Sequence, residues 1–306
     1  MSFTAEVKDE ASRVAPTCEN CLRAELSALV RIEGTLTLVG SGACRLEVST
    51  ETASVARSII KLMHSENLKT ELTMRRSVLN KASNYLITVP SQPHLAEVLD
   101  ELGILTSDGI VGGIEPSLVE KQCCAAAYLR GAFLGGGFIA DPRGDSHFEL
   151  TMQSESLAQA LVELLARYEI KARINHRRNS YIVYIKGGDY ITMFLALIGA
   201  HRSVLAIENV RVIKSVRSDV NRKLNAEMAN QAKASEASVK QRMAIQKIRQ
   251  AGKFQDMPQA LRDFAKLREE NPFVSLRELG ELASPPLSKS AVYHRVRRIE
   301  EIASNL

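Results

Sequence analysis

Two stretches of the chain repeat one order of apolar and polar positions at an offset of about one hundred residues. Each begins with an apolar segment of helical spacing that a glycine follows, over residues 21–33 in the first copy and 123–135 in the second. Each later contains an amphipathic helix with apolar residues on one face. These residues are Val55, Ile59, Leu62 and Met63 in the first copy and Leu157, Leu161, Leu164 and Leu165 in the second.

The segments between these helices alternate apolar and polar residues, as half-buried strands do. The predicted strands are 35–39, 45–49, 71–75 and 85–89 in the first copy and 138–140, 147–151, 172–176 and 181–185 in the second. A closing helix is predicted over 95–102 and again over 191–198. The pattern therefore predicts the element order αββαββα in both copies.

Polar residues recur along with the apolar ones. Ser54 and Lys69 of the first copy, for example, return as Ser156 and Lys171 in the second. Two unrelated units that share only a periodicity would not repeat these identities, so the pattern favours a duplicated domain. We expect this domain to span residues 1–208, with its repeats at about 18–105 and 120–208.

The first helix of each copy carries small residues, with Ala28 in one and Gly131 and Gly135 in the other. A glycine inside a helix costs about 1 kcal/mol relative to alanine, so its presence indicates a packing requirement. Small residues let two helix backbones approach closely. The sequence therefore predicts that these two helices pack side by side about a pseudo-twofold axis.

The hydrophobic pattern changes after the duplicated domain. Residues 209–238 are polar and basic, with alanines that favour helix but offer little apolar surface, and we interpret them as a linker running into a helix. Apolar spacing returns in the following residues, which predicts a helix and the start of a domain spanning 239–306. The apolar positions of this helix are Val239, Met243, Ile245 and Ile248.

Capping residues mark two further helices near the C-terminus. Ser275 and Glu278 have the spacing of a capping box, which opens a short helix over 276–282. Ser288 is a good N-cap for a last helix over about 289–303. Two helices joined by a tight, proline-containing turn have the order of a helix-turn-helix.

The last helix has one apolar and one polar face. The apolar positions, expected to face inward, are Val292, Val296, Ile299 and Ala303. The positions expected to face outward and contact DNA are Lys289, Ser290, Tyr293, His294, Arg297 and Arg298. In a DNA-binding helix, the N-terminal residues contact base edges and the arginines further along contact phosphates. The alternative is an ordinary helical hairpin with a solvated face.

Charge is distributed unevenly along the chain. The formal net charge is +5, but residues 1–208 hold 21 Lys and Arg against 24 Asp and Glu, whereas residues 209–306 hold 19 against 11. Phosphate-binding surfaces are basic, so the C-terminal end is the predicted nucleic-acid-binding part. Within 209–238, the basic residues Arg217, Arg222 and Lys223 leave two interpretations open: a solvated linker or phosphate contact.

The repeated motifs point to a family. Residues 26–34 (LSALVRIEG) and 129–137 (LRGAFLGGG), together with the αββαββα order, resemble the LAGLIDADG homing endonucleases. With the opening MSFTAEVKDE and the C-terminal SLRELGELASPPLSKSAVYHRV, nearly the whole chain resembles the WhiA family, bacterial regulators with a degenerate LAGLIDADG domain and a helix-turn-helix. The resemblance implies an α+β fold, with a duplicated LAGLIDADG-like domain followed by an all-α helix-turn-helix domain.

The resemblance also bears on catalysis. LAGLIDADG nucleases place one acid at the end of each motif helix, and the two acids hold divalent metals. Here Glu33 remains, whereas Gly136 stands at the matching position of the second motif, and Asp141 lies five residues further along. One acid cannot form a symmetric two-metal site, so we expect no nuclease activity and no catalytic residues.

Other cofactor sites are weakly indicated. The glycines near Gly136 lack the lysine and hydroxyl residue of a phosphate-binding loop. Cys18 and Cys21 have the spacing of half a zinc site, but no second pair stands nearby in the sequence. We expect the protein to reside in a reducing compartment, where its cysteines remain thiols. We also expect these cysteines to act as small core residues, and we predict neither a metal nor a cofactor.

The resemblance implies a transcriptional regulator of cell division, chromosome segregation and sporulation. Double-stranded DNA is its expected partner, and residues 1–208 are available for a regulatory protein partner. No apolar run reaches the length of about 18 residues that a membrane span needs, and the early charges do not fit a signal peptide, so we expect a cytoplasmic, nucleoid-associated protein. Two rival interpretations are a protein-interaction adaptor with incidental DNA contact and a residual nuclease.

Overall fold

The computed structural model describes residues 2–39, 43–76, 83–107 and 109–306. Its contacts divide the chain into two compact units, Met1–Ile213 and Lys214–Leu306.

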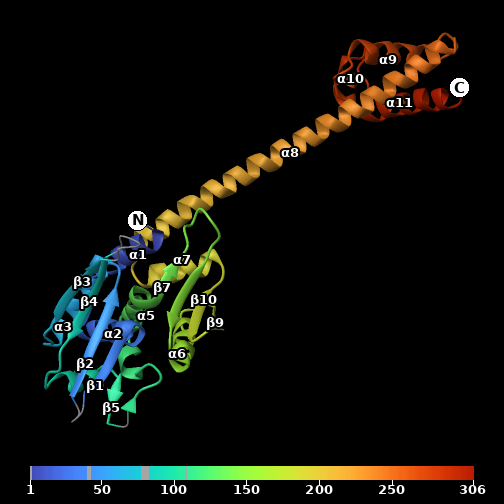
Figure 1. Cartoon of the computed structure of the whole chain (residues 1–306). Coiled ribbons are helices and arrows are strands. Elements are labelled where there is room, and N and C mark those ends of the chain that lie inside the picture. The colour runs from blue at the N-terminus through green and yellow to red at the C-terminus, as the bar shows by residue number, and fades with distance from the viewer. Residues whose placement is uncertain (1, 40–42, 77–82, 108) are drawn as a thin grey trace. The chain divides into compact units, whose positions relative to one another are not determined.

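The first unit contains the same arrangement of seven elements twice (Figure 1). The first copy comprises α2 (Glu19–Glu33), β1 (Gly34–Val39), β2 (Ala43–Thr50), α3 (Ala53–Ser65), β3 (Glu71–Arg76), β4 (Ser83–Val89) and α4 (Leu95–Glu101). The second comprises α5 (Gln122–Gly136), β7 (Gly137–Ile139), β8 (Phe148–Met152), α6 (Glu155–Ala166), β9 (Ala172–Arg177), β10 (Ser180–Ile185) and α7 (Gly188–Leu197). The predicted order αββαββα is confirmed.

Each copy folds into one four-stranded antiparallel sheet. The strand orders are β1-β2-β4-β3 and β7-β8-β10-β9, so the two sheets have the same topology. Their inner strands contribute alternate side chains to the core, as the alternation in the sequence predicts. In β8, for example, Phe148, Leu150 and Met152 are buried, while Glu149 and Thr151 between them are half-buried.

Helices α2 and α5 pack side by side between the two sheets (Figure 1). The contact is close at Gly131, where an added Cβ would lie 2.3 Å from the carbonyl oxygen of Glu25 and 3.0 Å from the Cβ of Ala28. The backbone of α2 therefore occupies the space that a side chain at position 131 would need. This confirms the packing requirement that the helical glycine indicates.

The substitution Gly131→Ala tests this contact. We expect it to destabilise the first unit by about 2–3 kcal/mol, because the cost of overpacking against backbone exceeds the gain in helix propensity of about 1 kcal/mol. Hydrogen–deuterium exchange of α2 and α5, combined with chemical denaturation, measures the loss. Gly113→Ala is the matched control, since an added Cβ there meets nothing within 4 Å. Equal stability of the two variants would contradict the close helix pair.

The sequence pattern does not predict four smaller elements. They are α1 (Phe3–Ala11), β5 (Leu105–Thr106), β6 (Gly109–Ile110) and the 3-10 helix η1 (Pro116–Val119). Helix α1 is short and polar, but Ser2 caps it and Val7 and Ala11 are buried against the rest of the unit. Tertiary contacts thus stabilise α1, although its apolar pattern is too short to predict a helix from the sequence.

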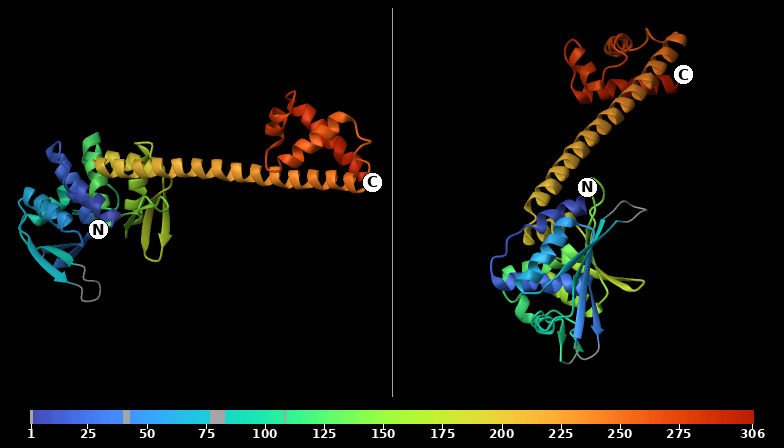
Figure 2. Two further views of the ribbon diagram at one scale, coloured as in Figure 1. Left: turned by 90° about the horizontal axis from the view of Figure 1, so that it is seen from above. Right: turned by 60° about the vertical axis from the view of Figure 1, so that its left-hand side comes forward.

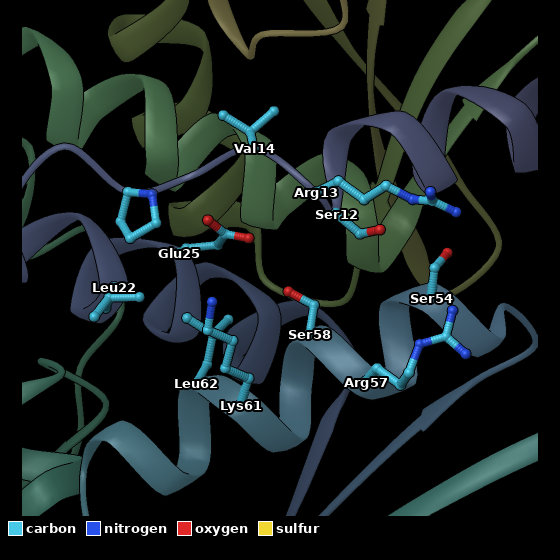
Figure 3. A pocket seen from close by; sticks show the side chains of 11 residues that line it. Ser12, Arg13, Val14, Leu22, Glu25, Ser54, Arg57, Ser58, Lys61 and Leu62 are labelled. Carbon is cyan, nitrogen blue, oxygen red and sulfur yellow. The ribbon is translucent and has the colours of Figure 1, made fainter.

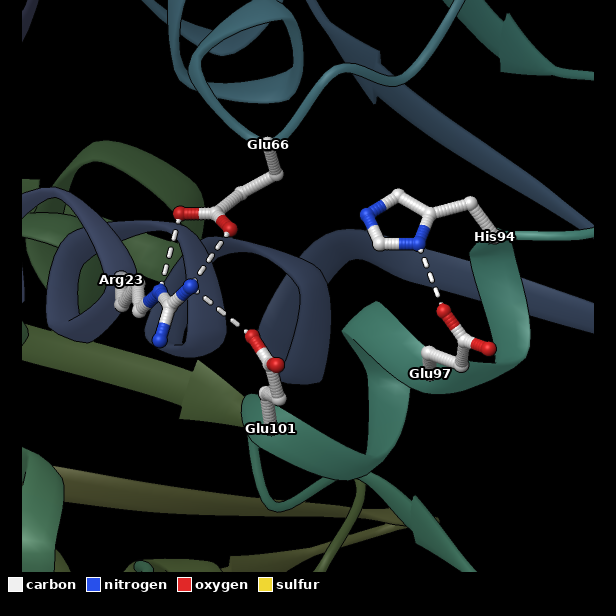
Figure 4. Close-up of polar contacts among 5 residues, drawn as sticks. All are labelled: Arg23, Glu66, His94, Glu97 and Glu101. Atoms are coloured by element: carbon white, nitrogen blue, oxygen red, sulfur yellow. Dashed lines mark hydrogen bonds and ion pairs between the residues drawn. The ribbon is translucent and has the colours of Figure 1, made fainter.

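Ion pairs join α2 to the elements that follow it. Arg23 of α2 donates two hydrogen bonds of 3.2 Å to Glu66, which ends α3, and also pairs with Glu101 of α4 at 2.9 Å (Figure 4). At the start of α4, His94 Nδ1 lies 2.8 Å from Glu97 Oε2 (Figure 4). Most of these side chains are exposed to solvent, although Glu66 is largely buried, so the ion pairs orient the helices more than they stabilise them.

Helix α8 (His201–Gln250) is one continuous helix, and residues 209–238, interpreted above as a linker running into a helix, lie within it. Their alanines have the highest helix propensity of any residue. In its last turns the buried positions include Ser238, Gln241, Ile245 and Ile248. Val239 and Met243, assigned to the apolar face by the sequence, are exposed, so that part of the prediction is wrong. The hydroxyl of Ser238 instead donates to the carbonyl of Pro272, which turns a polar residue inward.

The second unit is completed by α9 (Gln259–Glu270), α10 (Leu276–Leu282) and α11 (Lys289–Ser304). These helices pack around the C-terminal turns of α8 (Figure 2) and share one apolar core. The predicted start and end of α10 and the predicted Ser288 cap of α11 are confirmed. The predicted inward face of α11 is also confirmed, because Val292, Val296, Ile299 and Ala303 are all buried.

Candidate functional site

Helix α11 presents a polar face to solvent. All six side chains that the sequence assigns to this face are exposed: Lys289, Ser290, Tyr293, His294, Arg297 and Arg298. The Tyr293 and His294 rings form an edge contact with centroids 6.3 Å apart, and Arg297 and Arg298 both pair with Glu301 at 3.2 and 3.1 Å. The N-terminal half of this face thus exposes hydrogen-bond donors and two rings, with the Ser290 hydroxyl 3.1 Å from that of Ser288, while its C-terminal arginines pair with a carboxylate.

Local hydrogen bonds fix the geometry of α10 and α11. Ser275 and Glu278 form both bonds of the capping box, and the Ser288 hydroxyl accepts from the amide of Ala291. Between the helices, the amide of Leu287 donates a 2.8 Å bond to the carbonyl of Gly280. An added Cβ at Gly280 would lie 2.7 Å from the Leu287 carbonyl oxygen, so the close turn requires glycine there.

Arg268 of α9 links the helices beneath this site. Its side chain is buried and donates to Gln241 Oε1 at 2.9 Å and to the carbonyls of Asn271 and Val274 at 3.2 and 2.8 Å. Burial lowers the pKa of the guanidinium. These bonds connect α8, α9 and the loop that precedes α10, which positions the short helix and the turn after it.

Helix α8 carries the three basic residues that the sequence leaves open for phosphate contact. Arg217, Arg222 and Lys223 are all exposed. Arg222 pairs with Asp219 one turn earlier. An exposed ion pair of this kind contributes little to stability, so it does not prevent Arg222 from contacting phosphate.

The C-terminal ends of α2 and α5 lie beside Lys8 of α1. The Lys8 Nζ donates a 2.8 Å hydrogen bond to the carbonyl of Gly135. Burial lowers the pKa of Lys8, although the negative charge of Glu33 acts to raise it. Burial likewise raises the pKa of Glu33, and the charge of Lys8 opposes that shift. An ammonium group of the chain itself therefore supplies positive charge next to the one motif acid.

The matching position of the second motif has no room for an acid. An added Cβ at Gly136 would lie 2.2 Å from the carbonyl oxygen of Thr151 and 2.9 Å from a methyl group of Ile32. Asp141, the next acid along the chain, lies in the exposed turn after β7 and pairs with Arg143 at 2.6 Å. The structure thus brings no second carboxylate from these candidates to the helix ends.

Sequence reasoning missed a buried ion pair between the motif helices. Arg130 of α5 donates to Glu25 Oε2 of α2 through Nη2 at 2.6 Å and Nε at 3.0 Å, and both side chains are almost fully buried. Burial raises the pKa of Glu25, while Arg130 and Lys61 oppose that shift. The available signal was Arg130, the single charged residue of the largely apolar helix α5, whereas Glu25 is one of five charged residues in α2.

A cavity of about 440 Å³ lies beside Glu25 (Figure 3). Lys61 and Ser58 of α3 line one side of it, and the segment after α1 lines the other. Figure 3 shows the Lys61 ammonium extending toward the Glu25 carboxylate. The cavity is therefore lined by Glu25 of the buried ion pair and by Lys61, whose positive charge acts on the Glu25 carboxylate.

The structure brings together four cysteines that the sequence separates into two pairs. The Sγ atoms of Cys18, Cys21, Cys123 and Cys124 all lie within 4.8 Å of one another. The expectation that no second pair stands near Cys18 and Cys21 is therefore wrong in space, although it holds along the sequence. Cys21 and Cys124 occupy equivalent positions in the two repeats, and the packing of α2 against α5 makes equivalent positions neighbours. Cys44 is buried elsewhere, as a small core residue is expected to be.

No helix among the described residues combines the length and apolar character that crossing a membrane requires.

Models of known protein families match three consecutive parts of the chain. The WhiA N-terminal LAGLIDADG-like domain matches residues 19–105, the WhiA LAGLIDADG-like domain matches 125–217, and the WhiA C-terminal HTH domain matches 220–303. The molecule is thus of the class that joins two LAGLIDADG-like units to a helix-turn-helix.

Individual relatives match the chain over its whole length. The probable cell division protein WhiA of Heliobacterium modesticaldum is 42% identical over 306 residues, covering 99% of this chain and 96% of the relative. That of Brevibacillus brevis is 40% identical over 311 residues, covering 100% and 98%. The crystal structure of full-length DUF199/WhiA from Thermatoga maritima is similar, with a TM-score of 0.64 and 26% identity, covering 100% of this chain and 99% of that one. The chain belongs to the WhiA family.

Proposed function

We propose that this protein is a sequence-specific, double-stranded DNA-binding regulator of transcription that contacts DNA mainly through α11. The observation that carries the proposal is the exposed face of α11, whose N-terminus is fixed by the Ser288 cap in the basic part of the chain. A capped helix end presents its first residues in a fixed orientation, as reading base edges requires.

The side chains of α11 suggest a division of roles. Lys289, Ser290, Tyr293 and His294 lie in its first two turns and can reach base edges, where hydrogen bonds and apolar contacts distinguish base pairs. Arg297 and Arg298 lie further along and would exchange their pairing with Glu301 for DNA phosphates. Arg217, Arg222 and Lys223 of α8 are proposed as further phosphate contacts that fix position without reading sequence.

Fluorescence anisotropy with duplex DNA tests the proposal, using fragments selected by a genome-wide map of occupancy. We expect the full chain to bind these fragments tightly, with an observed affinity that falls steeply as salt rises, because lysine and arginine displace counterions from DNA. Unrelated duplexes of equal length should bind at least tenfold more weakly. Equal affinity for both sets of fragments would show that the contact is incidental and would favour an adaptor role.

We further propose that the regulated processes are cell division, chromosome segregation and sporulation. Support comes from relatives that are named probable cell division proteins and from the family resemblance. A fluorescent fusion in the host is expected to coincide with the nucleoid in the cytoplasm. Loss of the gene is expected to disturb division, with rescue by the wild-type chain and not by a variant that lacks the α11 contacts.

We propose that the LAGLIDADG-like units do not cleave DNA. The positive charge of Lys8 lies beside Glu33, and Gly136 occupies the position of the second acid. Purified protein with magnesium is expected to leave target duplexes intact, and Gly136→Asp is expected to leave them intact as well. The added side chain would clash with the Thr151 carbonyl at 2.2 Å and cannot take the required place. Magnesium-dependent cleavage that disappears on Glu33→Ala would refute this proposal.

Residues 1–208 are proposed to bind a regulatory protein partner. The near-neutral charge of this region does not suit a DNA groove, and apolar side chains are exposed on its strands, among them Leu72 and Met74 of β3. Cross-linking in the host with a photoreactive residue at position 74 is expected to capture a partner, whereas the same residue at Arg143, which is exposed in the turn after β7, should not.

A further inference from the structure

The four clustered cysteines lie where the two halves of the duplicated unit meet. Cys18 is the N-cap of α2 and Cys21 lies in its first turn, while Cys123 and Cys124 lie in the first turn of α5. These are the helix ends opposite to Glu33 and Gly136. The cluster is therefore separate from the motif ends, and it shares no residue with the proposed DNA contacts.

The distances between the sulfur atoms match those of one tetrahedral metal site. From Cys18 Sγ, the other three sulfurs lie at 3.3, 3.9 and 3.5 Å, and both Cys21–Cys124 and Cys123–Cys124 measure 3.9 Å. A tetrahedron with zinc–sulfur bonds of about 2.3 Å has edges of about 3.8 Å. Shifts well below 1 Å would complete the geometry, and all four ligands come from elements that pack firmly.

We propose that Cys18, Cys21, Cys123 and Cys124 bind one structural zinc ion that joins α2 to α5. Four thiolate ligands in a tetrahedron favour zinc among the common divalent metals. A polynuclear iron–sulfur core would hold the four sulfurs further apart than they are here. The Cys-x-x-Cys spacing of the first pair is usual in structural zinc sites, and the second pair comes from the other repeat.

The surroundings suit a site with negative charge. Neither Cys18 nor Lys121, the N-cap residues of α2 and α5, makes a side-chain capping bond. The first-turn amides of both helices can therefore donate to thiolates, and both helix dipoles direct positive potential at the cluster. Cys18 and Cys123 are half-buried, which gives a metal ion a path into the site, whereas Cys21 and Cys124 are buried.

Zinc would stabilise the pairing of the repeats directly. Each half of the duplicated unit supplies two ligands, so the ion would cross-link the two LAGLIDADG-like units at the start of the helix pair. This complements the Glu25–Arg130 ion pair and the close contact at Gly131 further along the same helices.

Metal analysis of the full chain tests the assignment. Protein purified in reductant without chelators is expected to contain about one zinc ion per chain by mass spectrometry of the elements. The double variant Cys18→Ser/Cys123→Ser, which changes the two half-buried ligands, should lose the zinc. Cys44→Ser, which changes the buried cysteine outside the cluster, is the matched control and should retain it.

A second measurement does not depend on how the variants fold. Cobalt(II) added to the zinc-depleted, reduced full chain is expected to give the sulfur-to-cobalt charge-transfer and strong d–d absorption of a tetrahedral thiolate site. About one equivalent of zinc should displace the bound cobalt and abolish this absorption. Absence of this spectrum in the wild-type chain would overturn the proposal, as would zinc retained by the double variant. A metal-free protein with a disulfide within the cluster, or one with stoichiometric iron in place of zinc, would overturn it as well.

Discussion

Replacing Lys289, Tyr293 and His294 of α11 with alanine in the full chain is expected to weaken binding to target duplexes by about 100-fold or more. Each side chain that contacts a base edge contributes about 1–3 kcal/mol of discrimination, so three of them account for at least this loss. All three side chains are exposed, and Tyr293 is 58% exposed, so the apolar core behind α11 stays intact. The loss should therefore be one of recognition and not of folding.

Fluorescence anisotropy on the selected fragments measures the effect, with circular dichroism to verify the fold. The matched control is Lys171→Ala/His176→Ala, which removes a lysine and a histidine exposed in the first unit. We expect the control to bind like the wild-type chain. If the α11 variant also bound like the wild-type chain, α11 would not be the reading helix, and the LAGLIDADG-like unit would become the candidate surface.

Substitution of Arg217, Arg222 and Lys223 should act differently. Phosphate contacts carry no sequence information, so their loss is expected to weaken target and unrelated duplexes by the same factor. The slope of affinity against salt should also become shallower by about one for each contact removed. This difference in salt dependence separates the two sets of residues.

The substitution Arg130→Met is expected to destabilise the first unit by about 3–5 kcal/mol, because it leaves the buried carboxylate of Glu25 without its partner. The pair is almost completely buried, with 5% and 7% of the two side chains exposed. A buried charge that loses its counter-charge costs more than the pair itself contributes. The double variant Glu25→Leu/Arg130→Met should therefore recover most of the loss.

The pH dependence of this variant supplies a second signature. Burial raises the pKa of Glu25 above its unfolded value, and removing Arg130 removes a charge that opposes the shift. A carboxyl whose folded pKa is raised contributes stability below its unfolded pKa and loses that contribution as pH rises through the folded pKa. The deficit of Arg130→Met should thus be smaller near about pH 5 than near about pH 7.5.

Chemical denaturation at both pH values, with hydrogen–deuterium exchange assigning the transition to α2 and α5, measures this deficit. Arg143→Met is the control, because Arg143 is exposed and pairs only on the surface with Asp141. A deficit for Arg130→Met that equals the control, or one independent of pH, would refute the role assigned to the buried pair.

The sequence alone determined the elements of both units where local physics governs them. Period-2 and helical apolar patterns place the strands and helices of the two αββαββα copies, because a half-buried element must present one apolar face. The Ser275 and Ser288 caps place α10 and α11, because a helix start needs an acceptor for its free amides. The exposed face of α11 follows from the same helical period.

The tertiary structure alone decided what meets across long sequence separations. Lys8 reaches the carbonyl of Gly135, Arg130 reaches Glu25, and Cys18 meets Cys124. These partners lie more than one hundred residues apart, and no periodicity encodes their encounter, because it depends on how α1, α2 and α5 pack. The exposure of Val239 could not be predicted from the sequence for the same reason. The helices that pack against α8 determine which of its faces is buried, and the apolar residues of α8 alone do not.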